Sequence, residues 1–276
     1  MLIVGDDFMP FNSELNGKQN EYDFVKNING KRIRDLSPMI QMFLYDYYGK
    51  ITNYNEYVYA WMNSKKQKTD FFIRLSSNNN PIRISLKKGV KNSVHVEPIT
   101  EFIHFLIENK VPKKIIKKIL LYHYADGTTN NTGSLRMDIS EYKVEHQDDI
   151  DEINKYFNQE KMLKKFIKRF VTQGRNDLNE IDVLIYGVID DFIWIKTDDI
   201  YSIILAKKDV YSSALHFGSL TYQVKNRCIN RNPKYEGDRH IIQIKWYNIS
   251  DDIIENMNNN VMKKMKSDRC EYQKIE

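Results

Sequence analysis

The stretch TDFFIRLSSNNNPIRISLKK, residues 69–88, predicts a β-hairpin. Residues 69–75 are rich in Phe, Ile and Leu, and residues 82–88 alternate apolar with polar side chains, as strands with one buried face do. The asparagine run and the proline at 78–81 favour a turn between them. We therefore expect two antiparallel strands joined by a short connection.

Within this hairpin, polar side chains are expected to meet on one face. Asp70 opens the first strand, and Ser85 and Lys87 lie two residues apart on the second, with Leu86 between them pointing into the core. Metal-assisted hydrolysis of a phosphodiester needs a carboxylate that binds a hard cation and a lysine that stabilises developing negative charge or helps to activate water. A nuclease site centred on Asp70 and Lys87 is our leading hypothesis.

The chain on both sides of the hairpin mixes helical and strand periodicities. We expect helices at 20–29, 38–48, 53–62, 98–109, 112–124, 140–156, 159–171, 198–207 and 251–265, and further strands at 181–188, 192–196, 219–225 and 240–247. The mixture predicts an α/β or α+β protein with a mixed central sheet flanked by helices. We expect a catalytic core at 1–172 and a C-terminal part at 173–276, which forms either a second lobe or part of the same domain and contributes strands and DNA contacts.

Composition limits the class of protein. Of the 276 residues, 41% are hydrophobic and 29% are charged, with a net charge of +5; this is typical of a globular protein and only weakly favours a nucleic-acid partner. No apolar run reaches the roughly eighteen residues of a membrane span, and no basic region precedes the short apolar start. Two cysteines, Cys228 and Cys270, form neither a zinc spacing nor a disulfide framework. We expect a cytoplasmic protein without a membrane partner.

The hairpin resembles the PD-(D/E)XK signature of type II restriction endonucleases. Thr69-Asp70 is followed by Ile84-Ser85-Leu86-Lys87, and the resemblance covers roughly residues 20–105. Ser85 stands where most members have an acidic residue, as in variants that carry a non-acidic polar side chain there. The second carboxylate is then expected from Glu21, on the first helix, or from Glu97, just after the hairpin.

The resemblance implies a restriction-endonuclease-like fold and a site-specific deoxyribonuclease that depends on Mg²⁺. Asp70 and Glu97 are then candidate metal ligands, while Lys87, Ser85 and Glu21 complete the catalytic set. It also implies double-stranded DNA as substrate, a homodimer for a palindromic target, and a cognate DNA methyltransferase in the same restriction or phage-defence system.

Two segments are candidates for DNA contacts. Lys88, Lys91 and Asn92 follow the second hairpin strand and are rich in hydrogen-bond donors suited to phosphates. The stretch 222–240 is dense in Lys, Arg, Asn and Tyr, and Arg, Asn and Gln are the side chains that read guanine and adenine. The residues expected to contact DNA there are Arg227, Asn230, Arg231 and Arg239; a solvated loop is the alternative.

The sequence is also compatible with alternatives to the leading hypothesis. Asp182, followed by Gln243-Ile244-Lys245, forms a second D…QxK pattern, although its apolar flanks favour core strands. In function, the missing acid at Ser85 is compatible with a non-catalytic DNA-binding protein of defence or regulation. A nuclease acting on RNA is the third possibility.

Overall fold

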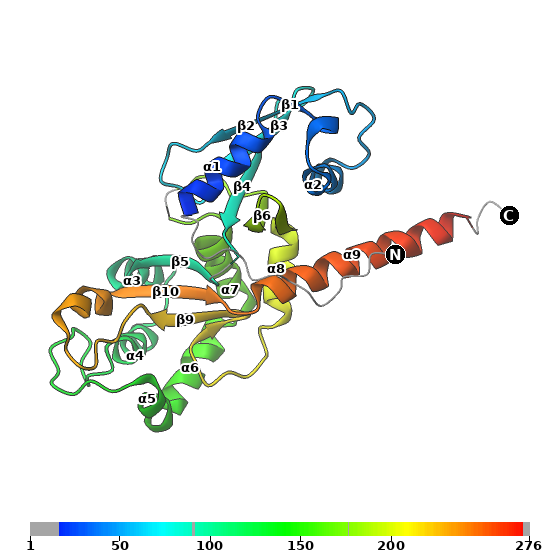
Figure 1. Ribbon diagram of the computed structural model, residues 1–276. Helices are drawn as coiled ribbons and strands as arrows, with labels where there is room; N and C mark the ends of the chain where they lie inside the picture. Colours follow the sequence, from blue (N-terminus) through cyan, green and yellow to red (C-terminus); the bar gives the residue numbers. More distant parts are fainter. Residues whose placement is uncertain (1–16, 90–91, 176, 273–276) are drawn as a thin grey trace. The chain divides into compact units, whose positions relative to one another are not determined.

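The computed structural model describes residues 17–89, 92–175 and 177–272, with the helical backbone alone at 261–272. The chain forms two compact units that interleave in sequence (Figure 1). Unit 1 comprises Met1–Lys91, Arg175–Asp199 and Ser250–Glu276, and unit 2 comprises Asn92–Gly174 and Ile200–Ile249. The expected division into 1–172 and 173–276 is therefore corrected: the point near residue 173 is one of several where the chain passes between units.

Unit 1 is built on a six-stranded mixed sheet with the order β1-β2-β3-β4-β6-β7. β4 and β6 run parallel and the other neighbours are antiparallel. Parallel neighbours need a crossover connection, and here the first segment of unit 2 lies between them in the sequence. The elements of unit 1 are α1 (Gly17–Ile28), β1 (Lys31–Arg32), η1 (Ile33–Asp35), α2 (Pro38–Tyr48), β2 (Tyr57–Met62), β3 (Phe71–Leu75), β4 (Ile82–Lys87), β6 (Val183–Val188) and β7 (Asp191–Lys196).

The alternation predicted for the hairpin sets which face of this sheet is buried. Phe71 and Ile73 on β3, and Ile84 and Leu86 on β4, belong to one hydrophobic cluster together with Phe24 of α1. α2 adds Phe43 and Leu44 to the same cluster. Ser37 caps the N-terminus of α2, where its hydroxyl accepts a hydrogen bond from the Ile40 backbone N–H. The polar residues of β3 and β4 consequently face the other side of the sheet.

The expected helix at 53–62 is wrong, because this segment contains β2. Val58 and Ala60 point into the core and are nearly fully buried, while Tyr57, Tyr59 and Trp61 alternate with them on the exposed side. The period is two, as in any strand with one buried face. Aromatic side chains on the outward positions hid this alternation, since outward positions are normally polar.

Unit 2 pairs a four-stranded antiparallel sheet, ordered β5-β10-β9-β8, with a group of helices. Its core is aromatic: Phe102 contacts Phe157, Phe166 and Phe170, and Phe217 packs among them. Its elements are β5 (Ser93–Pro98), α3 (Ile99–Glu108), α4 (Lys113–Tyr124), α5 (Ile139–Glu145), α6 (Gln147–Phe157), α7 (Glu160–Ile167), a π-helical turn (Lys168–Thr172), β8 (His216–Phe217), β9 (Leu220–Val224), η3 (Pro233–His240) and β10 (Ile241–Trp246). The helices α8 (Thr197–Ala206) and α9 (Ile249–Tyr272) begin in one unit and continue in the other.

The predicted fold class is confirmed: the protein is α+β, with a mixed sheet, a second antiparallel sheet and flanking helices. Most predicted elements are also confirmed within a few residues of their ends. β5 was missed because its main partner, β10, lies about 145 residues away in the chain, with Ile242 opposite Glu97.

Candidate active site on the mixed sheet

Asp70 lies directly before β3 and is fixed by the neighbouring strand. Phe71 pairs with Ile84, so the next pair outward is Asp70 opposite Ser85, and the Asp70 backbone N–H donates to the Ile84 carbonyl at 2.8 Å. The Asp70 Oδ2 atom accepts from the Leu86 backbone N–H at 2.6 Å and from the Ser85 hydroxyl at 3.2 Å. Among the described residues nothing donates to the other carboxylate oxygen, Oδ1, so this oxygen is open to a ligand.

Ser85 and Lys87 lie on the same face of β4, as the sequence predicts. Ser85 is fully buried and its hydroxyl is used to hold Asp70. Lys87, at the end of the strand, is only partly buried, and within the described residues its ammonium makes no hydrogen bond or ion pair. A lysine that lies near a carboxylate but does not form an ion pair with it can bind a negatively charged substrate.

Glu21 comes to the same end of the sheet from α1. The preceding residue, Asn20, is buried and donates from Nδ2 to the Gly187 carbonyl at 2.9 Å, which ties α1 to the carboxyl end of β6. Gly187 is required there, because its φ is +138° and a Cβ would lie 2.3 Å from the Asp191 carbonyl oxygen. β4 and β6 are parallel, with Lys87 opposite Tyr186, so α1 is fixed close to the end of β4.

The charges of this cluster interact. The pKa of Glu21 is raised from 4.5 to about 7, first by burial and then by the negative charge of Asp70, while Lys87 and Lys18 act against this shift. A carboxylate whose pKa is raised by burial and by a neighbouring negative charge is a common feature of metal and acid–base sites. Structural ion-pair networks also shift pKa values, but Glu21 makes no hydrogen bond or salt bridge among the described residues.

Lys68 is a further member that the sequence interpretation missed. Burial lowers its pKa well below the usual value, Lys87 lowers it further, and Asp70 opposes this effect. The available signal was its position two residues before Asp70, in the run KKQKTD. Two lysines and two carboxylates therefore share one end of the sheet.

Glu97, the other expected carboxylate, belongs to unit 2. It lies on β5, and Arg169 grips it with two hydrogen bonds, Nη2 to Oε2 at 2.6 Å and Nε to Oε1 at 3.2 Å. His95 Nε2 lies 3.3 Å from Oε2. Burial alone would raise the pKa of Glu97, but the hydrogen bonds from His95 and Arg169 outweigh burial and hold it below its usual value. This carboxylate is committed to an internal ion pair, so Glu21 is the better second carboxylate.

The second D…QxK pattern, formed by Asp182, Gln243 and Lys245, is divided between the two units. Asp182 precedes β6 in unit 1, and its oxygens accept from the backbone N–H and the guanidinium of Arg83, at 2.7 and 2.8 Å. Gln243 and Lys245 lie on β10 in unit 2. Asp182 thus holds β4 beside β6, which is a structural role.

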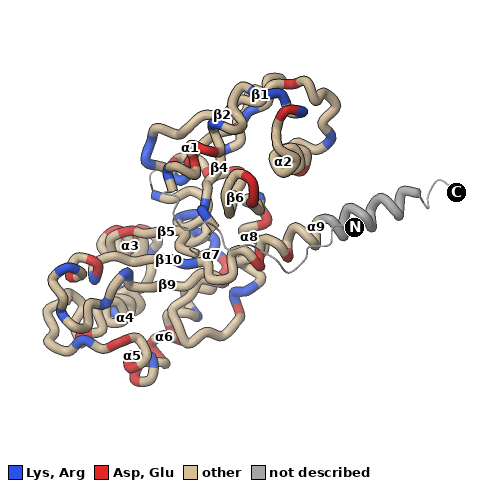
Figure 2. The backbone as a smooth tube through the Cα atoms, in the orientation of Figure 1, with Lys and Arg blue, Asp and Glu red and all other residues tan. Residues whose placement is uncertain are grey.

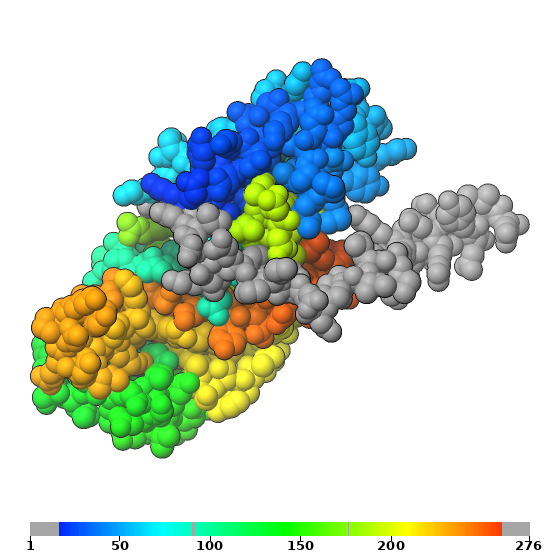
Figure 3. Space-filling model, in the orientation of Figure 1, coloured from blue at the N-terminus to red at the C-terminus, as the bar shows by residue number. Residues whose placement is uncertain are grey.

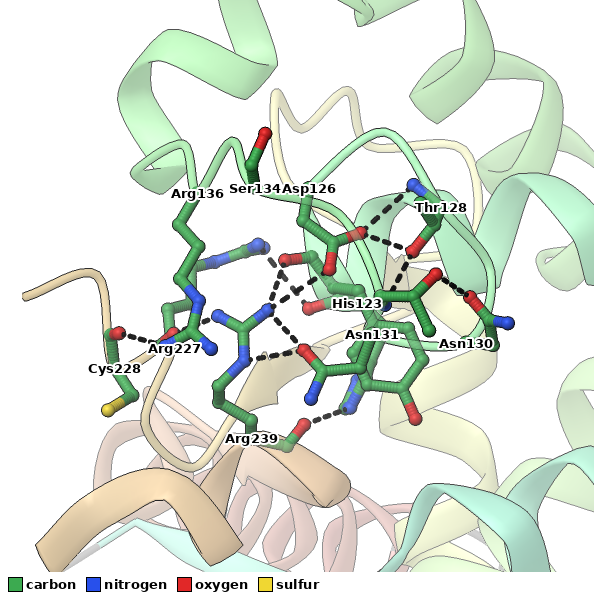
Figure 4. A network of polar contacts seen from close by, with 12 residues as sticks. His123, Asp126, Thr128, Asn130, Asn131, Ser134, Arg136, Arg227, Cys228 and Arg239 are labelled. Atoms are coloured by element: carbon green, nitrogen blue, oxygen red, sulfur yellow. Dashed lines mark hydrogen bonds and ion pairs between the residues drawn. The ribbon is translucent and has the colours of Figure 1, made fainter. Parts of the chain in front are cut away.

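The stretch 222–240 was expected to contact DNA, and for Arg239 this prediction is wrong. Arg239 is 2% exposed; it donates to Asn131 Oδ1 from Nε at 2.9 Å and to the Tyr124 carbonyl from Nη2 at 3.1 Å, and also to the Arg227 carbonyl (Figure 4). Asp126 Oδ2 lies 3.6 Å away. A guanidinium enclosed in this way cannot reach a base edge. The segment itself lies at the surface, in orange in Figure 3, but this arginine points inward.

The other residues predicted to contact DNA differ in how many hydrogen bonds they make within the protein. Arg227 donates to the Tyr122 carbonyl at 2.9 Å and lies over the Tyr122 ring at 5.1 Å. Arg231 and Asn230 are exposed, and Arg231 donates to the Ser134 carbonyl. Lys88 is partly exposed just after β4 and Asn92 begins unit 2, whereas Lys91 lies outside the described residues. Arg231, Asn230 and Lys88 remain the accessible candidates.

The donor set at the end of β4 fits a hard divalent cation. Mg²⁺ is usually bound by one or two carboxylates, with waters and substrate phosphates as its other ligands. Asp70 Oδ1 and Glu21 meet this requirement, and Asn20 Oδ1 is a buried oxygen without a hydrogen-bond donor among the described residues. Over the described residues as a whole, no group of three or more His, Cys, Asp or Glu side chains lies together in a way that could hold a metal ion.

The comparisons with known proteins leave the family open. No protein-family model matches the chain, and no curated protein has a similar sequence. No helix among the described residues is both long enough and apolar enough to cross a membrane.

Proposed function

We propose that unit 1 carries the active site of a Mg²⁺-dependent nuclease that hydrolyses phosphodiester bonds of DNA. The observation that supports it is the convergence of Asp70, Glu21 and Lys87 at the carboxyl end of β4, with Asp70 Oδ1 and the Lys87 ammonium uncommitted among the described residues. In open sheets with parallel strands, ligands commonly bind beyond the carboxyl ends of those strands, and β4 and β6 are the parallel pair here. The residues that meet there are those that phosphodiester hydrolysis requires.

Each side chain has a distinct part in this proposal. Asp70 and Glu21 hold the cation, which when bound supplies positive charge against the scissile phosphate. The Leu86 backbone N–H and the Ser85 hydroxyl fix the Asp70 carboxylate, so that Oδ1 keeps one orientation. Lys87 stabilises the negative charge that develops on the phosphate oxygens, or orients the attacking water. Lys68 places a second amine at the same end of the sheet, and burial, which lowers its pKa, favours the neutral form of this amine.

The wider setting follows from the same proposal. Site-specific cleavage of double-stranded DNA in a restriction or phage-defence system would take place in the cytoplasm. A palindromic target would call for a homodimer, and a methyltransferase would protect the host DNA. The cytoplasmic setting, the homodimer and the methyltransferase all depend on the nuclease proposal and fail if the protein does not cut DNA.

The test compares Lys87→Ala with Lys245→Ala on unmethylated plasmid and phage DNA, with Mg²⁺ and with EDTA. We expect cleavage that needs Mg²⁺ and falls by about 10²–10³-fold in Lys87→Ala, the cost of losing one preorganised charge-stabilising group. Lys245→Ala, from the competing pattern, should cut as the wild type does. Equal cleavage by wild type and Lys87→Ala would place the active site elsewhere, and a duplex RNA cut in preference to DNA would change the substrate.

One observation favours a second function. Ser85 lacks the carboxylate that metal sites of the resembled family usually have on β4, and it is fully buried. A non-catalytic DNA-binding protein would bind DNA with a strong dependence on salt but show no Mg²⁺-dependent cleavage. The same experiment separates the two functions.

A further inference from the structure

An exposed row of aromatic side chains lies on the sheet of unit 1. Tyr57, Tyr59 and Trp61 occupy alternate positions of β2 and are 42%, 38% and 40% exposed. Large aromatic side chains on the solvent face of a sheet cost free energy unless something covers or uses them. β2, which carries all three, lies beside β3 in unit 1 (Figure 1).

The row lies on the same face as the candidate active site. Trp61 pairs with Phe72 and Tyr59 with Arg74, so these side chains point to one side of the sheet. On β3, Phe72 is two residues from Asp70 and therefore shares its face, about 7 Å away along the strand. The aromatic row on β2 thus lies beside the strand, β3, that Asp70 precedes.

Basic groups accompany the rings. The guanidinium of Arg32 lies 5.3 Å from the centre of the Tyr57 ring, and that of Arg74 lies 5.2 Å from Tyr59. Figure 2 shows basic positions, in blue, near the labels of β1, β2 and β4. On β2 and β3 the outward residues are aromatic or basic, apart from Asp70 just before β3. Such a face attracts an anionic partner.

We propose that this face, defined by Tyr57, Tyr59, Trp61, Phe72 and Arg74, is a stacking platform for a single-stranded nucleic acid. Unpaired bases stack on aromatic side chains without sequence preference, and arginines beside them contact phosphates. The Trp61 and Phe72 rings already stack on each other, with centres 5.4 Å apart and planes at 18°, so one more ring can extend the stack. Bases inside a duplex are already stacked on each other and cannot use such a platform.

Together with the proposed function, the platform narrows the substrate. A strand that stacks on Trp61 and Phe72 would bring its next phosphates to Asp70 and Lys87. The preferred substrate would then contain unpaired nucleotides beside the cut, either as a single strand or as a flank of a duplex. This consequence depends on the nuclease proposal, whereas binding to the platform does not.

The experiment measures binding in EDTA with Lys87→Ala protein, so that no cleavage interferes. The probes are labelled oligo(dT) and oligo(U) of 20 nucleotides and a blunt-ended 20-base-pair DNA duplex, and binding is measured by fluorescence anisotropy. We expect Tyr59→Ala and Trp61→Ala each to weaken binding of the single strands by about 5- to 150-fold. Tyr59→Phe and Trp61→Phe should keep most of the affinity, because the ring remains. The two oligonucleotides tell DNA from RNA.

Tryptophan emission provides a second readout. The chain has three tryptophans; Trp194 and Trp246 are buried, at 5% and 0% exposed, whereas Trp61 is accessible. Bases that stack on the platform should quench an emission component that is absent from Trp61→Phe. Tyr247→Ala, an exposed tyrosine of unit 2, is the matched control and should bind as the parent protein does.

Several results would overturn the platform. They are unchanged binding of the single strands by both alanine variants, or an equal loss of binding for the blunt-ended duplex. A third is a dimeric parent protein that becomes monomeric in the alanine variants by sedimentation, which would make a second copy of the chain the occupant. If single strands bind through Trp61 but the wild type never cuts, the nuclease proposal fails alone. If cleavage depends on Lys87 but Tyr59 and Trp61 are dispensable for binding, the platform fails alone.

Discussion

The two units each contain a dense polar cluster, and the clusters differ in how their groups are used. Around Arg239 in unit 2, the guanidinium is surrounded by carbonyls, Asn131 and Asp126, and it is almost completely buried. At the end of β4 in unit 1, Lys87 is uncommitted among the described residues and the pKa of Glu21 is raised to about 7. A polar cluster marks a functional site when some of its groups are held in place but left unsatisfied; a fully paired cluster stabilises the fold.

The largest expected effect tests the structural side of this comparison. Arg239→Ala should lower the free energy of unfolding by about 3–5 kcal/mol, because it leaves Asp126 and several carbonyls buried without their partner. Urea denaturation measures this, and Arg231→Ala, an exposed arginine in the same segment, should change stability by less than about 0.5 kcal/mol. A stable Arg239→Ala protein with weakened DNA binding would restore Arg239 as a DNA contact.

A smaller effect is expected at Ser85, where the hydroxyl both fills the interior and fixes Asp70. Ser85→Ala should cost about 1.5 kcal/mol of stability, the low end for a hydrogen bond to a charged group, because the 3.2 Å bond is long. It should also raise the Mg²⁺ concentration needed for cleavage, since Asp70 is then held by Leu86 alone. The measurements are urea denaturation and a Mg²⁺ titration of cleavage.

The control for Ser85 is another serine of the chain. The Ser219 hydroxyl is buried and has no hydrogen-bond partner among the described residues, so Ser219→Ala should leave stability unchanged or slightly higher and should not alter the Mg²⁺ requirement. If Ser85→Ala behaves in the same way, the hydroxyl has no part in positioning Asp70.

What the sequence predicted and missed follows the range of the interactions. The hairpin of Asp70 and Lys87 was predictable, because a turn and two short alternating segments carry all of it. Arg239 was misread because Tyr124, Asp126 and Asn131, more than 100 residues away, determine that it is buried. The interleaving of the two units was also hidden, since the sequence near residue 173 has no composition typical of a linker.

Within unit 1, Glu21 could be partly predicted from the sequence, whereas Lys68 could not. Glu21 was suggested by the resemblance and its helix was visible in the sequence, but its raised pKa arises from burial and from Asp70, which only the folded chain supplies. Lys68 had no periodicity to mark it, because it lies in a connection before β3. β2 carried the information for the aromatic face, yet its outward rings made a strand resemble a helix.

The smallest expected effect concerns Glu21 and depends on pH. With a pKa of about 7 in the folded chain against an ordinary 4.5, Glu21 binds its proton more tightly when folded. The metal-free protein should therefore be most stable below about pH 4.5 with respect to this group, and should lose that contribution as the pH rises to about 7. Glu21→Gln, which cannot ionise, should remove this decline and be more stable than the wild type at pH 8 in EDTA, by on the order of 1 kcal/mol after allowing for screening at a partly exposed site.

Magnesium should reverse the order of these two proteins. Above pH 7 the wild-type Glu21 is ionised and binds the cation, and a ligand that binds the folded state alone adds stability in proportion to the logarithm of its concentration. Mg²⁺ should then raise the melting temperature of the wild type more than that of Glu21→Gln, and more at pH 8 than at pH 5. Asp23→Asn, on the same helix, is the control and should follow the wild type. A wild type and a Glu21→Gln variant whose stabilities run parallel from pH 5 to pH 8, with and without Mg²⁺, would show that Glu21 neither carries the raised pKa nor meets a cation. The contrast between the two clusters would then rest on Asp70 and Lys87 alone.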